Sequence, residues 1–205
     1  PGAPGFDLAK HLRFDGQLRL RYEALDPFSY TAAGVNQADD AVLMRTRLGA
    51  LFTLHPKLAF RVQIQDSRAW GEEGASTATS PAGSVTTSVD NVDLHLAYVD
   101  LTGLYERVFG RGALSLRVGR QELSYGDQRL VSPLDWANTA RAWDAAKITF
   151  DPPSAPWGFK ADLFASIIRD VASSNTVGGP TASGVSDLDA KQGFHGLYMS
   201  FEDIH

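Results

Sequence analysis

Apolar and polar residues alternate with a period of two along much of the chain. In residues 14–24, Leu18 and Leu20 share one side with other apolar residues, whereas Arg19 and Arg21 occupy the opposite side. Strict alternation is typical of a β-strand with one apolar face, because a helix would mix the two sets around its circumference. The pattern predicts strands over residues 14–24, 42–54, 58–65, 92–99, 114–121, 146–150, 159–167 and 194–201.

The connections between these segments alternate between long and short. Long polar connections cover residues 25–41, 71–91 and 169–191, whereas a short turn surrounds Pro56. Transmembrane β-barrels have this organisation, with short turns at one end and long loops at the outer end. Several segments also have the length of a tilted membrane-crossing strand. The pattern therefore predicts an all-β fold, an antiparallel up-and-down transmembrane β-barrel in which residues 1–205 form a single domain.

A soluble β-barrel or sandwich would show the same alternation with its apolar face turned inward. Two features favour the membrane alternative. The polar side is rich in arginine, and aromatic residues such as Tyr22, Trp70 and Trp157 recur near segment ends, where transmembrane barrels carry aromatic girdles. We therefore predict that the apolar side faces lipid. Its members include Leu18, Leu20, Leu48, Phe60, Val62, Leu94, Leu116 and Leu163.

Composition and charge exclude several classes of function. No apolar run approaches the roughly 20 residues of a transmembrane helix. The net charge of −5 and the lack of a basic tail argue against nucleic acid as a partner. The absence of cysteine excludes disulfides, thiolate metal sites and a cysteine nucleophile. Of the 19 basic residues 14 are arginine, and these gather on the regular segments, so the net charge conceals a local basic surface.

The charged side of the strands is expected to face the lumen. An Arg or Lys on the lipid side costs roughly 2–4 kcal/mol at the bilayer centre. Guanidinium groups bind carboxylates in a two-pronged way and stay charged at any working pH. A row of them attracts an anion without forming one deep trap, as conduction requires. The predicted pore-lining residues are Arg19, Arg21, Arg45, Arg47, Arg61, Arg117, Lys147 and Lys160.

An alternative role for these cations is structural, in a ladder of ion pairs that stiffens the barrel wall. The acidic members of such a ladder would be Asp15, Glu23, Asp93 and Asp162.

The segment that follows the strand at 114–121 is long and mixes charged with aromatic residues. Arg120 and Glu122 fall on the apolar side of that strand, so the strand is expected to leave the bilayer, bulge or turn inward near Gly119. We predict that residues 126–144 form a loop inserted into the pore. Its aromatic residues would stack on sugar rings, and the alternative is a self-packed outer loop. The candidate constriction residues are Arg120, Glu122, Asp127, Arg129, Asp135 and Arg141.

Motifs for catalysis are missing from the sequence. His95 beside Asp93 could act as a base, and Ser115 or Ser124 as a nucleophile, but no G-x-S-x-G or H-E-x-x-H motif is present. The five histidines are scattered without the spacing of metal ligands. We therefore expect no enzymatic activity, no catalytic residues, no metal and no cofactor.

Several sequence blocks resemble the alginate-export family of bacterial outer-membrane porins. The most specific block, R-Q-E-L-S-Y-G-D-Q-R, covers residues 120–129. Other blocks follow in family order, and G-Q-L-R-L-R-Y-E and R-T-R-L-G are two of them. The similar segments are residues 16–23, 45–49, 63–71, 92–101 and 116–144.

The resemblance implies a large outer-membrane barrel of about eighteen strands, with a basic lumen that passes an anionic polysaccharide. Eight strands are predicted here and the sequence given ends at His205 without a terminal aromatic residue, so we expect the N-terminal part of such a barrel.

The expected function is that of a porin in the bacterial outer membrane, which passes anionic solutes, such as alginate or small anions, by passive diffusion. Expected partners are outer-membrane lipids, lipopolysaccharide and periplasmic export proteins. Two alternatives remain open, namely a soluble β-barrel ligand-binding module and an outer-membrane structural barrel that scaffolds a complex.

Overall fold

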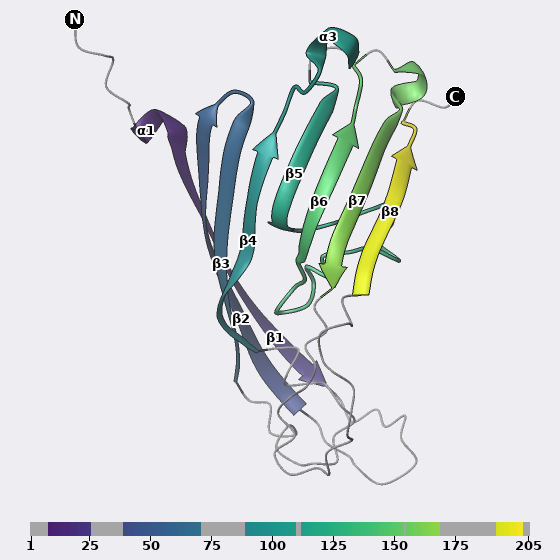
Figure 1. The fold of residues 1–205 in the computed structure, drawn as a ribbon. Helices are drawn as coiled ribbons and strands as arrows, with labels where there is room; N and C mark the ends of the chain where they lie inside the picture. Colours follow the sequence, from purple (N-terminus) through teal and green to yellow (C-terminus); the bar gives the residue numbers. More distant parts are fainter. Residues whose placement is uncertain are drawn as a thin grey trace, which may run out of the picture. The chain divides into compact units, whose positions relative to one another are not determined.

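The computed structural model describes residues 8–25, 39–70, 89–109, 112–153, 155–168 and 192–202. Eight strands form one antiparallel sheet in which each strand neighbours the next along the chain (Figure 1). In this order β1 and β8 are the edge strands of the described sheet. The strands are β1 (Leu12–Leu25), β2 (Asp39–His55), β3 (Leu58–Trp70), β4 (Asp90–Leu101), β5 (Leu114–Gln121), β6 (Trp143–Phe150), β7 (Lys160–Ile168) and β8 (Gln192–Ser200).

The predicted all-β antiparallel fold is confirmed, and each predicted segment corresponds to one of these strands. The largest differences are at the C-terminal end of β3 and at the N-terminal ends of β2 and β6. Asp66 and Arg68 interrupt the apolar side of β3, but the strand continues because its last residues pair with β2, where Val42 lies opposite Trp70. Most of the long connections predicted over residues 25–41, 71–91 and 169–191 lies outside the described residues.

Helical structure in the described part of the chain is confined to single turns. These are α1 (Leu8–His11), α3 (Glu106–Phe109) and the 3-10 turn η2 (Pro156–Gly158). None of the helices in the described ranges has the length and apolar character needed to cross a membrane. The short turn predicted around Pro56 joins β2 and β3, with a register shift between Thr53 and His55.

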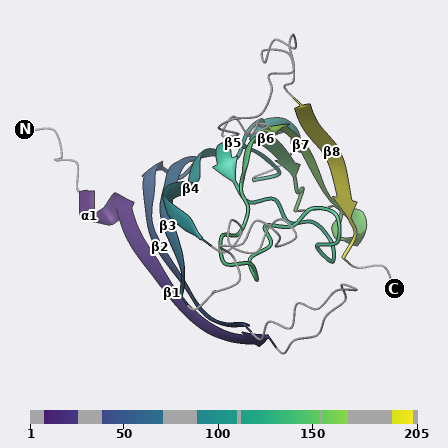
Figure 2. The same ribbon diagram turned by 90° about the horizontal axis from the view of Figure 1, so that it is seen from below.

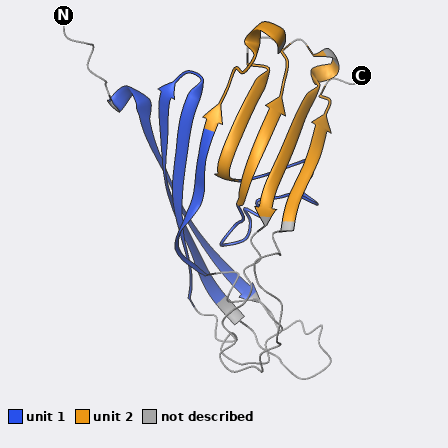
Figure 3. Cartoon of the chain, viewed as in Figure 1, with its two compact units in different colours: residues 1–99, 122–142 blue, residues 100–121, 143–205 orange. Residues whose placement is uncertain are grey.

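The chain divides into two compact units, shown in Figure 3. Unit 1 comprises residues 1–99 and 122–142, and unit 2 comprises residues 100–121 and 143–205. Unit 1 contains β1, β2, β3 and most of β4, with the segment 122–142. Unit 2 contains β5 to β8, where β5 pairs with β6, β6 with β7, and β7 with β8.

In unit 1 the burial of the two sides of the sheet is the reverse of that in a soluble protein. The apolar residues are exposed, with Leu20 at 64% and Leu48 at 57% relative exposure. The alternate polar positions of β2 and β3 are buried, among them Gln65 and Ser67, and Arg45 retains only 1% exposure. Because burying an unpaired charge is costly, this polar side requires partners. A soluble barrel would bury the leucines instead.

Unit 2 repeats the inverted pattern. On β7 the apolar Leu163 and Ile167 are exposed, whereas Asp162 and Ser166 are buried. Phe164 shares the buried side, where its ring packs over Gly196 of β8 with no room for a Cβ atom. The residues predicted to form the apolar face are therefore exposed, except for Leu116, which is half-buried.

The strand β5 does not bulge at Gly119, although Gly119 has a positive φ of 126°. Its register with β6 stays regular through Arg120 opposite Asp144 and Gln121 opposite Trp143. The strand ends at Gln121, and Glu122 then reaches the polar side, where it contacts His95. Of the three expectations for this point, the bulge is not found in the pairing with β6, which stays regular to the end of the strand.

A charge on the exposed apolar side should prevent membrane assembly. We predict that Leu20→Arg destabilises the protein in lipid bilayers by about 2–4 kcal/mol, if Leu20 lies near the bilayer centre. Urea unfolding in lipid vesicles measures this. The matched control is Leu130→Arg, because Leu130 is 97% exposed and lies outside the strands. Equal stability of the two variants would show that Leu20 does not face lipid.

Candidate functional site

Four arginines on β1 and β2 form the center of the polar side of unit 1. This arginine cluster consists of Arg19, Arg21, Arg45 and Arg47, brought onto one side by the two-residue repeat. Arg19 lies directly opposite Arg45 in the β1–β2 register. Like charges in directly opposed positions destabilise a sheet. The cluster therefore needs acceptors from outside these two strands.

Those acceptors are consecutive backbone carbonyls of residues 135–139, which we call the docked segment. Arg19 donates to the carbonyl oxygens of Asp135 at 2.6 Å and Ala137 at 2.7 Å. Arg45 donates to the same two oxygens at 3.0 and 3.3 Å. Arg21 donates to the intervening carbonyl of Trp136.

β3 holds the next two carbonyls of the docked segment. Ser67 donates its hydroxyl to the carbonyl of Asn138 at 3.0 Å, and Gln65 donates to the carbonyl of Thr139. The Asn138 side-chain amide in turn donates to the backbone carbonyls of Met44 at 3.2 Å and Arg68 at 3.1 Å. All five carbonyls of the docked segment are therefore bonded to strand side chains, across β1, β2 and β3.

The carboxylate of Asp135 contributes the main acidic contact of the cluster. It lies 2.9 Å from the Arg45 guanidinium and 3.1 Å from that of Arg47. Desolvation raises the pKa of Asp135, but the positive charges of Arg45 and Arg47 outweigh it, so the pKa lies below its ordinary value. Asp135 thus stays ionised and offsets part of the charge of the buried arginines.

A second contact fixes the beginning of the same segment. Glu122 lies 2.8 Å from Nε2 of His95 on β4 and 3.7 Å from the guanidinium of Arg47. His95 is buried, and Arg47 also donates to Gln65 at 2.6 Å. Residues 122–142 are therefore attached to the polar side of the strands at both Glu122 and the docked segment (Figure 2).

Residues 122–142 are also folded on themselves. The amide of Tyr125 donates to the carbonyl of Val131 at 3.2 Å, and that of Arg141 donates to the carbonyl of Pro133 at 2.7 Å. Ser132 is buried and accepts from the amide of Leu134 at 3.0 Å. The segment therefore has defined local structure.

Arg61 on β3 forms a two-pronged ion pair with Asp15 on β1, and one of its contacts measures 2.7 Å. The pair passes over Gly49 of β2, which lies opposite both Asp15 and Gln63. A Cβ atom at Gly49 would lie 2.6 Å from the Arg61 guanidinium. A side chain at position 49 would therefore have to displace the ends of Arg61 and Asp15 from this arrangement.

The remaining predicted pore-lining cations belong to unit 2, and each contacts an acid. Arg117 donates to Asp100 at 2.7 and 2.9 Å in a two-pronged pair. Lys147 lies 3.6 Å from Asp162, and Lys160 lies 3.4 Å from Asp151. Arg61 pairs with Asp15 in unit 1, and Arg21 pairs with Glu23 at 2.6 Å. These contacts form a ladder of ion pairs that uses the predicted acids Asp15, Glu23 and Asp162, together with Asp100 and Asp151, which were not predicted.

The candidate constriction residues separate into two groups. Glu122 and Asp135 contact the arginine cluster, as described above. Asp127 and Arg129 lie 3.8 Å apart and are highly exposed, and Arg141 is also exposed. Arg120 lies in unit 2, 4.0 Å from Asp144. Among the described contacts, none links Asp127, Arg129 or Arg141 to the arginine cluster.

Sequence reasoning did not identify the residues that hold the docked segment besides the arginines. Gln65 and Ser67 share the alternating side with Arg61, so the two-residue repeat contained a signal for their burial. His95 was considered only for catalysis, although its side of β4 is also the polar one. Asn138 carried no signal, because its role depends on the path of an irregular segment.

The fold and the site together define a class of protein. An antiparallel sheet with an exposed apolar side and a buried cationic side is typical of outer-membrane β-barrel proteins. A family model described as alginate export matches residues 10–205, so the chain belongs to the alginate export family. The family is one of outer-membrane export porins, not of enzymes. Comparisons with curated proteins and with solved structures gave no match.

Attachment of the docked segment should depend on pH through Asp135. A lowered pKa in the folded state means that ionised Asp135 stabilises attachment above the ordinary carboxyl pKa of about 3.9. This contribution is lost as the pH falls through the lowered pKa. We predict little change in attachment between pH 7 and 5, and release at lower pH.

A spin label at Trp136→Cys reports this release, because the natural chain has no cysteine. The label should become mobile only at acid pH, and Asp135→Asn should make it more mobile already at pH 7. Asp127→Asn is the matched control, because Asp127 is exposed and pairs only with Arg129 among the described ion pairs. Identical behaviour of the two variants would exclude Asp135 as an anchor.

Proposed function

We propose that the protein passes an anionic polysaccharide, a polyuronate such as alginate, by passive diffusion through a lumen bounded by the polar side of the strands. The observation that carries this proposal is the inverted burial, with exposed leucines on one side and the arginine cluster on the other. Membership of the alginate export family supports the substrate class. Carboxylates along a polyuronate match guanidinium donors in charge and geometry.

The eight strands belong, in this proposal, to a larger closed barrel of about eighteen strands. Edge strands expose unpaired backbone groups, which lipid cannot satisfy, so only closed barrels span a membrane with strands. The edges at β1 and β8 would therefore pair with further strands. The apolar side would face lipid and the ladder of ion pairs would stiffen the wall.

Charge balance supports the arginine cluster as the source of the proposed anion preference. The ladder pairs Arg61–Asp15, Arg117–Asp100 and Lys147–Asp162 each combine one cation with one acid. The cluster instead places four guanidinium groups against the carboxylates of Glu23, Asp135 and Glu122. A modest excess of positive charge attracts a polyanion without holding it, which suits conduction.

Of the loop predicted at residues 126–144, the last two residues belong to β6, and the remaining segment, residues 126–142, would narrow the lumen. Its attachment to the arginine cluster carries it over the polar side, and Trp136 remains 71% exposed while its carbonyl is held by Arg21. An exposed aromatic ring on a fixed backbone offers a surface on which a sugar ring can stack.

The two other functions have less support. A soluble ligand-binding module would bury the apolar side, which is exposed here on both Leu20 and Leu163. A structural barrel that scaffolds a complex is compatible with the ladder of ion pairs. It differs from a porin in conducting little, so conductance separates the two.

Ion selectivity in a planar bilayer tests the proposal. The full-length protein should prefer anions, and higher salt should weaken the preference, because ions screen lumen charges within about 10 Å at 0.1 M. Replacing Arg45 and Arg47 together by Gln should shift the reversal potential toward cations. A channel without anion preference in the unaltered protein would contradict the proposal.

Asp135→Asn is the matched variant for that experiment. It also weakens the docked segment, but it removes a negative charge where the arginine variant removes two positive ones. If charge determines selectivity, the two variants shift the reversal potential in opposite directions. If both variants shift the reversal potential in the same direction, movement of the docked segment is the cause and not charge.

Removing the segment should widen the pore. We predict that deletion of residues 127–138 raises conductance and weakens discrimination by size, while the barrel still assembles. The strands retain their ladder of ion pairs, and water in the lumen can solvate the released arginines. Asp127→Asn combined with Arg129→Gln serves as control, because both residues are highly exposed. Equal conductance with and without the segment would identify an ordinary outer loop.

A further inference from the structure

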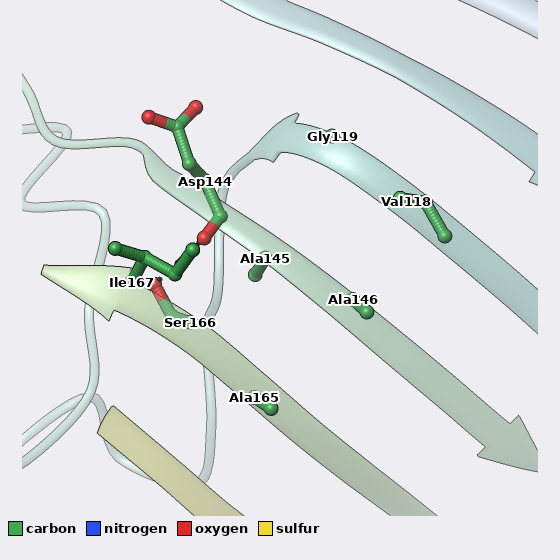
Figure 4. Close-up of a pocket in the computed structure, with 8 residues that line it drawn as sticks. All are labelled: Val118, Gly119, Asp144, Ala145, Ala146, Ala165, Ser166 and Ile167. Carbon is green, nitrogen blue, oxygen red and sulfur yellow. Dashed lines mark hydrogen bonds between the residues drawn. The ribbon is translucent and has the colours of Figure 1, made fainter. Parts of the chain in front are cut away.

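Unit 2 contains an apolar hollow that the transport proposal does not use. Its volume is about 470 Å³, and β5, β6 and β7 line it (Figure 4). Figure 4 shows Ala146 on β6 and Ala165 on β7 along the hollow, next to the larger side chains of Val118 and Ile167. The small residues create the hollow, because a methyl group leaves space that a leucine would fill.

The hollow opens on the exposed apolar side of the strands. Ala146 lies opposite both Val118 and Ala165 in the strand registers. Val118 is 47% exposed and Ile167 is 59% exposed, and both alanines are also exposed. This is the side that faces lipid in an outer-membrane barrel.

An ion pair lies at one end of the hollow. Arg120 follows Val118 by two residues on the same side of β5, and Asp144, which lines the hollow, lies opposite it on β6. Their side chains approach to 4.0 Å and retain 37% and 54% exposure. Charges on the lipid side are tolerated only near the membrane surface. Arg120 is the penultimate residue of β5, which fits a position at that surface.

We propose that this hollow binds a phosphorylated glycolipid of the outer leaflet, of the lipid A type. One acyl chain occupies the hollow, Arg120 binds the phosphate, and Asp144 accepts a hydrogen bond from a sugar hydroxyl. Arg120 and Asp144 lie at the ends of β5 and β6 that are joined by the long segment 122–142. Long connections lie at the outer surface of such barrels, so we assign this end of the hollow to the outer leaflet. The inference rests on the outer-membrane placement of the chain and not on conduction.

The chemistry of the site favours this lipid. Arginine binds phosphate with several directed hydrogen bonds, and basic side chains near the membrane surface attract anionic lipid head groups. The alanine-lined space provides apolar contact for a chain, whose burial gives affinity in proportion to its length. A free phosphate would use Arg120 alone and gain nothing from the hollow.

Native mass spectrometry of the full-length protein in detergent tests the proposal, with lipid A and phosphatidylethanolamine as probes. We expect lipid A to bind more tightly than phosphatidylethanolamine. Arg120→Gln should weaken lipid A binding by about tenfold or more, because a hydrogen bond to a charged group is lost. Ala146→Trp should weaken it similarly by filling the hollow. If Ala146→Trp fails to fold, Ala165→Leu fills part of the hollow with a smaller side chain and tests the same prediction.

Arg68→Gln is the matched control. Arg68 also lies near the end of a strand and pairs with an acid, Asp66, but it does not line the hollow. Binding should be unchanged in this variant. The proposal is overturned if Arg120→Gln binds lipid A like the unaltered protein, if folded hollow-filling variants do so, or if Arg68→Gln weakens binding equally. Equal binding of phosphatidylethanolamine would also overturn it. Conductance of the unaltered protein is a separate measurement and tests transport alone.

Discussion

The direct opposition of Arg19 and Arg45 across β1 and β2 is the constraint on which unit 1 depends. Two guanidinium groups on one side of a sheet, with Arg45 almost fully buried, are stable only if acceptors reach them. The docked segment supplies carbonyl dipoles and one carboxylate in that place. The segment therefore keeps these guanidinium groups paired, and the guanidinium groups in turn hold the segment on the strands.

This dependence follows from the inverted arrangement of the sheet. In a soluble β-protein the buried side is held together by apolar contacts, whereas here hydrogen bonds and ion pairs take that role. The pair of Arg61 and Asp15 over Gly49 illustrates the difference, since the backbone makes room for a polar contact where a soluble core would place a methyl group. Such a polar interior keeps its shape while remaining wettable.

The sequence was sufficient to predict the strands and which residues share a face. It was not sufficient to predict which groups pair with each charged residue. A period of two determines which residues share a side, so β5 (Leu114–Gln121) could be predicted to the residue. β3 was predicted too short, because Asp66 and Arg68 interrupt the apolar side and only pairing with β2 shows that the strand continues. The contacts of Asn138 depend on an irregular path between strands, which carries no period.

The docked segment is held mainly through its backbone, and this has a consequence for how such proteins diversify. Every residue type has the same backbone carbonyl as Trp136 or Ala137. All types except proline and glycine also share similar backbone preferences. Side chains at these positions can therefore change during evolution while the segment keeps its place on the strands. The strand residues that donate, such as Arg19 and Ser67, have no such freedom. Changes in the side chains that the docked segment exposes to a passing solute can then accumulate while the strands stay the same.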